Sequence, residues 1–262
     1  MVSSSTLKEL LNEYDKKQMI AISDLEKRKS ELYARIPRLQ EIETELNSFA
    51  IKTAKALLVK FDPSYISELQ NKANDLRLER ETILKKDGKD ISYLSPQYEC
   101  SKCKDTGYVL DDGKSVMCSC LKQQILNIEY NNSNIGNLDR ENFKKFNLNL
   151  YSDEVNEEKY GSDLSPRENI KVIGKEVKKF IKNFDDPNEK NLLFSGGTGL
   201  GKTFLSNCIV AELLAKGKTV LYQTAPVMLD TLISELFDKN SNNAFSQNLL
   251  TVDLLVIDDL GT

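Results

Sequence analysis

The stretch GGTGLGKT at 196–203 constrains the fold of this 262-residue chain more than any other segment. It matches the pattern G-x-x-x-x-G-K-[ST], whose proper context is the turn between a buried strand and the start of a helix. The apolar run NLLFSG leads into it, and KTFLSNCIVAELLAK follows with the composition of a helix that has a buried face. We therefore predict a strand at 191–196, a phosphate-binding loop, and a helix from residue 202.

The loop residues have specific roles in such a motif. Glycines let backbone N–H groups approach phosphates closely, and the helix N-terminus adds a partial positive charge. Lys202 is predicted to reach the β- and γ-phosphates of ATP, and the Thr203 hydroxyl to bind Mg²⁺. The strand–loop–helix context disfavours the alternative, a glycine-rich turn with a chance lysine. The predicted nucleotide-binding residues of the loop are Gly196, Gly197, Thr198, Gly199, Leu200, Gly201, Lys202 and Thr203.

A second apolar run, DLLVIDD at 253–259, delivers two carboxylates to its end. In P-loop nucleotidases, a strand of this kind carries an acid that holds Mg²⁺. Asp258 is the predicted magnesium and nucleotide-site residue. Asp259 is predicted to orient or deprotonate the attacking water, and with Lys202 it completes the predicted catalytic pair.

The segments around these motifs alternate between strand and helix. SPRE at 165–168 predicts a capping box with Ser165 as N-cap and Pro166 as the first helical residue. A strand at TVLYQT (219–224) and a helix from about 226 to 237 follow, with Gly217 ending the preceding helix. This alternation predicts an α/β P-loop domain with a mostly parallel sheet.

Four of the five cysteines form two close pairs, Cys100-x-x-Cys103 and Cys118-x-Cys120. KDTGYVLDDGKSVM lies between the pairs and predicts a short hairpin that turns at DDG. Four thiolates suit a closed tetrahedral Zn²⁺ site of the structural kind. Two disulfides or four unmetallated thiols are the alternatives. The fifth cysteine, Cys208, is predicted to pack in the core.

Residues 5 to about 86 predict an almost continuous helical region. Apolar residues recur there at spacings of three, four and seven, which makes one apolar stripe; they are Leu25, Leu32, Ile36, Leu39, Ile42, Leu46 and Phe49. Pro37 predicts a kink or restart, and FDPSY at 61–65 predicts a second break. The segment after it is predicted to run back as an antiparallel partner. A self-contained bundle and an arm that docks on a partner protein both fit this pattern.

Composition limits the class of protein. With 40% apolar and 29% charged residues and no long apolar run, the chain is predicted to be cytoplasmic, without a membrane span or signal peptide. The absence of histidine excludes histidine acid–base catalysis and histidine metal ligands. We expect four parts: helices at 1–90, a zinc module at 91–125, a linker at 126–164 and a partial ATPase domain at 165–262.

The chain resembles bacterial replicative helicase loaders of the DnaC/DnaI family, within the IstB-like group of AAA+ ATPases. The resemblance rests on CSKCKDTGY…CSCLKQQ, SPRENI, NLLFSGGTGLGKTFLSNCI and DLLVIDDLGT. It implies an AAA+ domain that binds ATP, Mg²⁺ and single-stranded DNA and can self-associate. It also implies an N-terminal region that binds a DnaB-type helicase, for loading in replication initiation or restart.

The resemblance implies further parts that would lie beyond residue 262. They are a central strand with a polar sensor residue, an arginine finger and a helical lid. We therefore expect the chain to be a fragment, truncated after the acidic strand, with very low ATP turnover. Many AAA+ proteins have glutamate where Asp259 stands, which also points to weak hydrolysis.

Two other functions are compatible with the same ATPase core. One is an IstB-like transposition helper, although the cysteine module and the long helical N-terminus argue against it. The other is a non-hydrolysing module that holds a partner through its helices and zinc unit.

Overall fold

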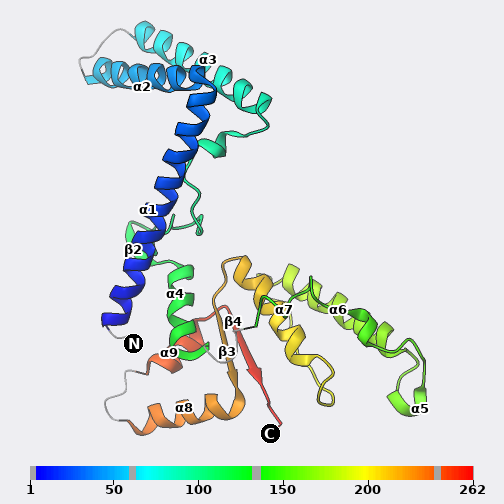
Figure 1. The fold of residues 1–262 in the computed structure, drawn as a ribbon. Coiled ribbons are helices and arrows are strands. Elements are labelled where there is room, and N and C mark those ends of the chain that lie inside the picture. Colours follow the sequence, from blue (N-terminus) through cyan, green and yellow to red (C-terminus); the bar gives the residue numbers. More distant parts are fainter. Residues whose placement is uncertain (1–3, 59–62, 132–136, 239–242, 262) are drawn as a thin grey trace. The chain divides into compact units, whose positions relative to one another are not determined.

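The computed structural model describes residues 4–58, 63–131, 137–238 and 243–261 (Figure 1). The chain divides into two compact units, residues 11–107 and residues 1–10 with 108–262. In the described ranges, no helix combines the length and apolar character that crossing a membrane requires.

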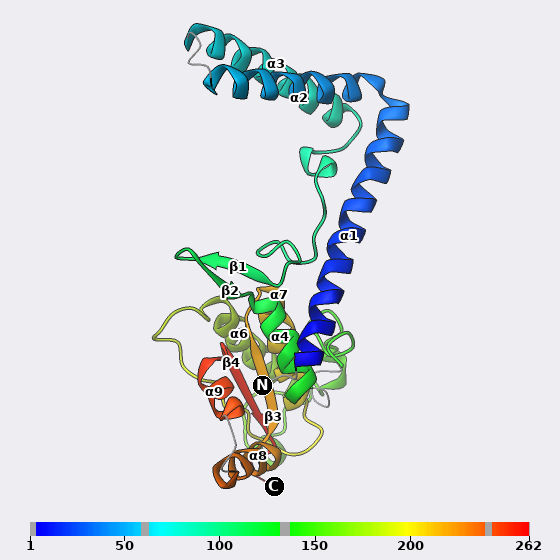
Figure 2. The same cartoon turned by 90° about the vertical axis from the view of Figure 1, so that its left-hand side faces the viewer.

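Long helices form most of the first unit. Figures 1 and 2 both show α2 and α3 side by side, as expected for an antiparallel pair. The predicted interruption at Pro37 is confirmed, because one helix ends just before Ile36 and the next begins at Pro37. The predicted break at 61–65 lies partly outside the described residues. The elements are α1 (Ser4–Arg35), α2 (Pro37–Leu58), α3 (Pro63–Lys86) and the 3₁₀ turn η1 (Ile91–Leu94).

A small apolar core joins these helices. Leu32, Leu39 and Leu84 come from α1, α2 and α3 and are almost fully buried against each other. On the solvent side, Arg38 donates to both carboxylate oxygens of Glu79 at 2.7 and 2.9 Å. Because that pair is well exposed, we assign the stability of the helix junction mainly to the leucine contacts.

The predicted hairpin between the cysteine pairs is confirmed. Strand β1 (Tyr108–Asp111) pairs antiparallel with β2 (Lys114–Met117), and Asp111 lies opposite Lys114. Asp112 and Gly113 form the turn with φ of 45° and 76°. Two successive residues with positive φ match the twist of a two-residue hairpin, which is why an Asp-Gly pair suits this position.

The segment after the hairpin covers the end of the predicted zinc module and the predicted linker at 126–164, and it contains short helical elements. Helix α4 (Ser119–Leu126) runs directly into the π-helical turn η2 (Asn127–Asn131). Two short turns follow further along, η3 (Leu148–Leu150) and α5 (Glu157–Tyr160).

The predicted capping box begins helix α6 (Pro166–Lys182). Glu168 N donates to Ser165 Oγ at 3.2 Å, and Ser165 N donates to a Glu168 carboxylate oxygen at 3.0 Å. Helix α7 (Lys202–Ala215) follows the glycine loop, and Gly217, with φ of 75°, lies beyond its end as predicted. Val177, Ile181, Ile209 and Leu213 pack the two helices together in one buried cluster.

Besides the β1–β2 hairpin, the described residues of this unit form a second sheet of two parallel strands. Strand β3 (Val220–Thr224) pairs with β4 (Leu254–Asp258), with Thr224 opposite Asp258. Helix α8 (Ala225–Phe237) and helix α9 (Ala244–Thr251) lie between them in sequence. Helix α9 was not predicted; Glu235 accepts hydrogen bonds from the backbone N–H groups of Phe245 and Ser246 at its start.

The predicted strand at 191–196 is wrong for this structure. These residues have no strand conformation, and Leu193 is 79% exposed. A strand requires a neighbour for its backbone hydrogen bonds, and in the described part of the chain neither β3 nor β4 pairs with this segment. An apolar run before a glycine loop is therefore insufficient to make a strand.

The outer edge of β3 is completed by side chains instead of a third strand. Gln123 accepts from Val220 N at 2.6 Å and donates to Val220 O at 3.0 Å. Asn131 donates to Val220 O and accepts from Tyr222 N, both at 2.9 Å. The α4–η2 segment thereby satisfies backbone groups that a neighbouring strand would otherwise bind.

Candidate nucleotide site and cysteine cluster

The glycine loop adopts a backbone that larger residues would disfavour. Gly201, the residue before α7, has φ of 91°, and a Cβ there would lie 2.8 Å from the Tyr151 hydroxyl oxygen. That hydroxyl donates to Leu200 O at 3.1 Å. Tyr151 therefore supports the loop from a segment that sequence analysis assigned to a linker.

Lys202 is turned back onto its own loop. Its Nζ donates to the carbonyl oxygens of Gly196 and Gly197, each at 2.9 Å. Two uncharged carbonyl groups of the loop therefore hold the ammonium group. Phosphate oxygens would be stronger acceptors for the same group because they are charged.

Thr203 and Asp258 come together as the sequence analysis predicted for a shared cation. Thr203 Oγ1 donates to Asp258 Oδ2 at 3.0 Å. Since the hydroxyl uses its hydrogen in this bond, its lone pairs remain for a cation. An anionic carboxylate beside a hydroxyl oxygen is a donor set that suits Mg²⁺.

Asp259 follows directly at the end of β4. Its side chain is exposed, its φ is 55°, and its N–H donates to Asp258 Oδ1 at 3.0 Å. That bond fixes the second oxygen of Asp258. The left-handed backbone turns the chain away from the strand direction at this residue.

Sequence analysis missed Tyr222. Its hydroxyl donates to Asp258 Oδ2 at 2.8 Å, the same oxygen that accepts from Thr203. Burial, and then the hydrogen bond to Asp258, raise the pKa of Tyr222 well above its ordinary range. The sequence does show a tyrosine in the strand before the acidic strand. Its contact with Asp258 could be predicted only with knowledge of how the two strands pair.

The predicted core position of Cys208 is confirmed, since its side chain is completely buried. Burial, with added repulsion from Glu141 and Glu212, raises the pKa of its thiol to about 11. The neutral thiol is the form expected for a packing residue.

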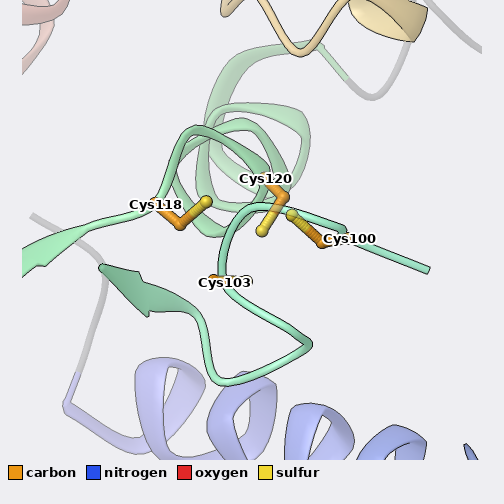
Figure 3. Close-up of side chains that lie close together, drawn as sticks. All are labelled: Cys100, Cys103, Cys118 and Cys120. Carbon is orange, nitrogen blue, oxygen red and sulfur yellow. The ribbon is translucent and has the colours of Figure 1, made fainter. Parts of the chain in front are cut away.

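The other four cysteines gather into one cluster, and Figure 3 shows their side chains converging. The four sulfur atoms lie within 4.8 Å of one another, with Cys103 and Cys118 buried. Tetrahedral zinc–thiolate bonds of about 2.3 Å require sulfur atoms about 3.8 Å apart, so a small contraction would complete such a site. The donor set fits Zn²⁺.

Asp105 orders the loop that carries the first two cysteines. Its carboxylate is 2% exposed and accepts from Glu99 N at 2.9 Å and Cys100 N at 2.8 Å. Lys104 N donates to Cys100 O at 2.8 Å and closes the turn. The backbone between Cys100 and Cys103 is therefore held independently of any metal.

Comparison with known proteins finds similarity in the C-terminal part of the chain. Residues 172–262 match the family model of the bacterial DnaA ATPase domain. This match covers less than half of the chain, and within it residues 172–262, called the ATPase segment below, are similar to a bacterial DnaA ATPase domain.

Individual relatives align over a similar share of the chain. The replicative helicase loader DnaC of Escherichia coli is 36% identical over 88 residues, which is 32% of this chain and 35% of DnaC. The replication initiator DnaA of Caulobacter vibrioides is 37% identical over 86 residues, 17% of its length. An uncharacterised Escherichia coli protein, YdaV, is 38% identical over 71 residues, 29% of its length.

The alignments thus span about a sixth to a third of these curated relatives. No solved structure shows a significant match to the chain. The resemblance to the DnaC group is confirmed over the ATPase segment, which is similar to the proteins DnaC and DnaA.

Proposed function

We propose that this protein is an ATP-binding helicase loader, which delivers a replicative DnaB-type helicase to single-stranded DNA. The similarity of the ATPase segment to DnaC carries the proposal, since that relative is a replicative helicase loader. The cysteine cluster upstream of the ATPase segment adds support, because it accompanies the ATPase core in the resemblance described above.

In this function, Lys202 exchanges the loop carbonyls for nucleotide phosphates. The backbone N–H groups of Gly196 to Thr203 and the N-terminus of α7 add the remaining attraction for negative charge. Thr203 and Asp258 would hold Mg²⁺, which neutralises charge on the phosphates when bound. Asp259 would act on the attacking water.

We propose that hydrolysis by this chain is very slow. The side chain of Asp259 is shorter than that of glutamate and is exposed. Its backbone has a left-handed conformation. Placing a water molecule depends on the reach and direction of the base. ATP binding, more than turnover, would then be the functional state.

The remaining parts have proposed roles as well. The helical region would dock on the helicase, and four cysteinates, Cys100, Cys103, Cys118 and Cys120, would hold one structural Zn²⁺. The ATPase segment would contact single-stranded DNA and further copies of itself. Such a protein would act in the cytoplasm, as part of primosome assembly.

A second candidate is a partner-binding module that binds ATP without hydrolysing it. The observation that favours it is the conformation of 191–196, which pairs with neither described strand of the sheet. A phosphate loop without a strand behind it is less rigid, and hydrolysis requires closer positioning than binding does.

Native mass spectrometry tests the proposal. The chain would be mixed with the replicative helicase from the same source, with and without ATP and Mg²⁺. A complex, with one zinc ion in the free chain, supports the loader. Absence of a complex, both with this chain and with one extended beyond Thr262, contradicts it.

A further inference from the structure

Tyr222 joins the apolar core to the magnesium-site carboxylate. Its side chain is 2% exposed and packs with Val210 and Val220. Only its hydroxyl leaves this cluster, and it lies 2.8 Å from Asp258 Oδ2. The ring is therefore fixed by packing, while its polar end reaches the predicted cation site.

The carboxylate of Asp258 is restrained at both oxygens. Oδ2 accepts from Tyr222 Oη and from Thr203 Oγ1, and Oδ1 accepts from Asp259 N. An aspartate at the end of a strand can otherwise rotate about two side-chain bonds. The tyrosine supplies the donor that comes from the neighbouring strand.

We propose that Tyr222 is a positioning residue for magnesium-dependent nucleotide binding, because its hydroxyl holds Asp258 in the orientation that faces Thr203. The inference rests on the proposed binding of ATP and Mg²⁺ at this loop. It adds a residue of β3 to a site that sequence analysis assigned to the glycine loop and the acidic strand alone.

The position of Tyr222 is itself fixed from outside the sheet. Its backbone N–H donates to Asn131 Oδ1 at 2.9 Å, and β4 lies on the other side of the strand. Packing against Val210 and Val220 fixes the ring, and the hydroxyl at its end donates to Asp258 Oδ2. Tyr222 thus offers Asp258 a donor of constant direction.

The alternative is a purely structural role, in which Asp258 simply satisfies a buried hydroxyl. The two roles predict different effects of removing the hydroxyl. A structural role lowers stability and weakens nucleotide binding equally with and without Mg²⁺. A positioning role weakens only the part of the affinity that depends on Mg²⁺.

Tyr222→Phe separates them, because it removes the hydroxyl and keeps the ring. A fluorescent ATP analogue would be titrated onto the full chain in EDTA, and Mg²⁺ would then be titrated at fixed nucleotide. We expect the affinity in EDTA to stay unchanged and the Mg²⁺ concentration for half-saturation to rise about tenfold, as for loss of a hydrogen bond to a charged group.

Tyr130→Phe is the matched control. Tyr130 is a partly buried tyrosine of the same unit whose ring lies 5.0 Å from that of Phe245, and no change in Mg²⁺ dependence is expected. If Tyr222→Phe does not fold, 3-fluorotyrosine at position 222 keeps the ring and makes a stronger donor. The half-saturating Mg²⁺ concentration should then fall.

An unchanged Mg²⁺ dependence in the variant, or equal losses with and without Mg²⁺, overturns the positioning role and leaves ATP binding intact. Failure of the unmodified chain to bind the nucleotide at all overturns the proposed function, and the inference with it. The two failures are therefore distinguishable in one titration.

Discussion

Lys202 Nζ lies 2.9 Å from the carbonyl oxygens of both Gly196 and Gly197, so the loop binds its own lysine. Entry of a phosphate must break these two hydrogen bonds. Because the replacement acceptors are charged, the exchange remains favourable. Under the proposed function, a bound nucleotide would displace this internal contact of Lys202.

Replacing Lys202 with alanine should weaken ATP binding at least about tenfold, since each charge-assisted hydrogen bond contributes about 1.5–3 kcal/mol. Titration with a fluorescent ATP analogue measures the effect. Lys190→Ala removes an exposed lysine before the loop and serves as control. Equal affinities for the two variants would contradict a phosphate-binding role for Lys202.

Replacing Cys103 with serine should abolish stoichiometric zinc binding and lower the melting temperature, because structural zinc contributes on the order of 10 kcal/mol to small modules. Atomic absorption and thermal unfolding measure both effects. Cys208→Ala, which leaves the cluster intact, should retain one zinc ion per chain. Full zinc content in Cys103→Ser would exclude the four-cysteine site.

Replacing Gln123 with alanine should destabilise the unit that contains β3 by about 1–3 kcal/mol, because Val220 N–H and C=O lose buried hydrogen bonds. Denaturant unfolding measures the loss. The control is Gln124→Ala, one residue along on the exposed side of α4. Similar stabilities for the two variants would show that the edge contacts contribute little.

The capping box predicts a pH-dependent contribution to stability. Ser165 N–H and Oγ–H donate to Glu168 and hold the pKa of that carboxyl below its ordinary value of 4.5. A lowered native pKa stabilises the fold above the unfolded-state pKa. This contribution is lost as the pH falls through the native value.

Glu168→Gln should therefore flatten the stability profile between about pH 6 and about pH 3.5. Denaturant unfolding at both pH values measures it, with Glu176→Gln on the same helix as control. A profile for Glu168→Gln as steep as that of the unmodified chain would assign the pH dependence to other carboxylates.

Local signals in the sequence predicted local structure well. The Asp-Gly turn, the capping box at Ser165 and the restart at Pro37 each depend on residues close in sequence. The meeting of Thr203 with Asp258 agrees with the motif prediction because both residues belong to well-defined patterns. Their catalytic and cofactor roles remain predictions.

Features that depend on distant pairing were not predictable in the same way. The run at 191–196 looked like a strand, but strand formation depends on a neighbour that the run itself does not specify. The roles of Gln123 and Asn131 became visible only when α4 and η2 were seen beside β3. Tyr222 likewise required the register of β3 against β4.

The hydrogen bonds from polar side chains to the backbone of Val220 and Tyr222 affect how the protein behaves in solution. An open strand edge is a template on which another chain can add a strand, and this leads to aggregation. Amides from Gln123 and Asn131 bind the N–H and C=O groups of Val220 and the N–H group of Tyr222, so an incoming chain cannot pair with these groups. This rim of the sheet is therefore protected against self-templated assembly by a segment that precedes the ATPase residues in the sequence.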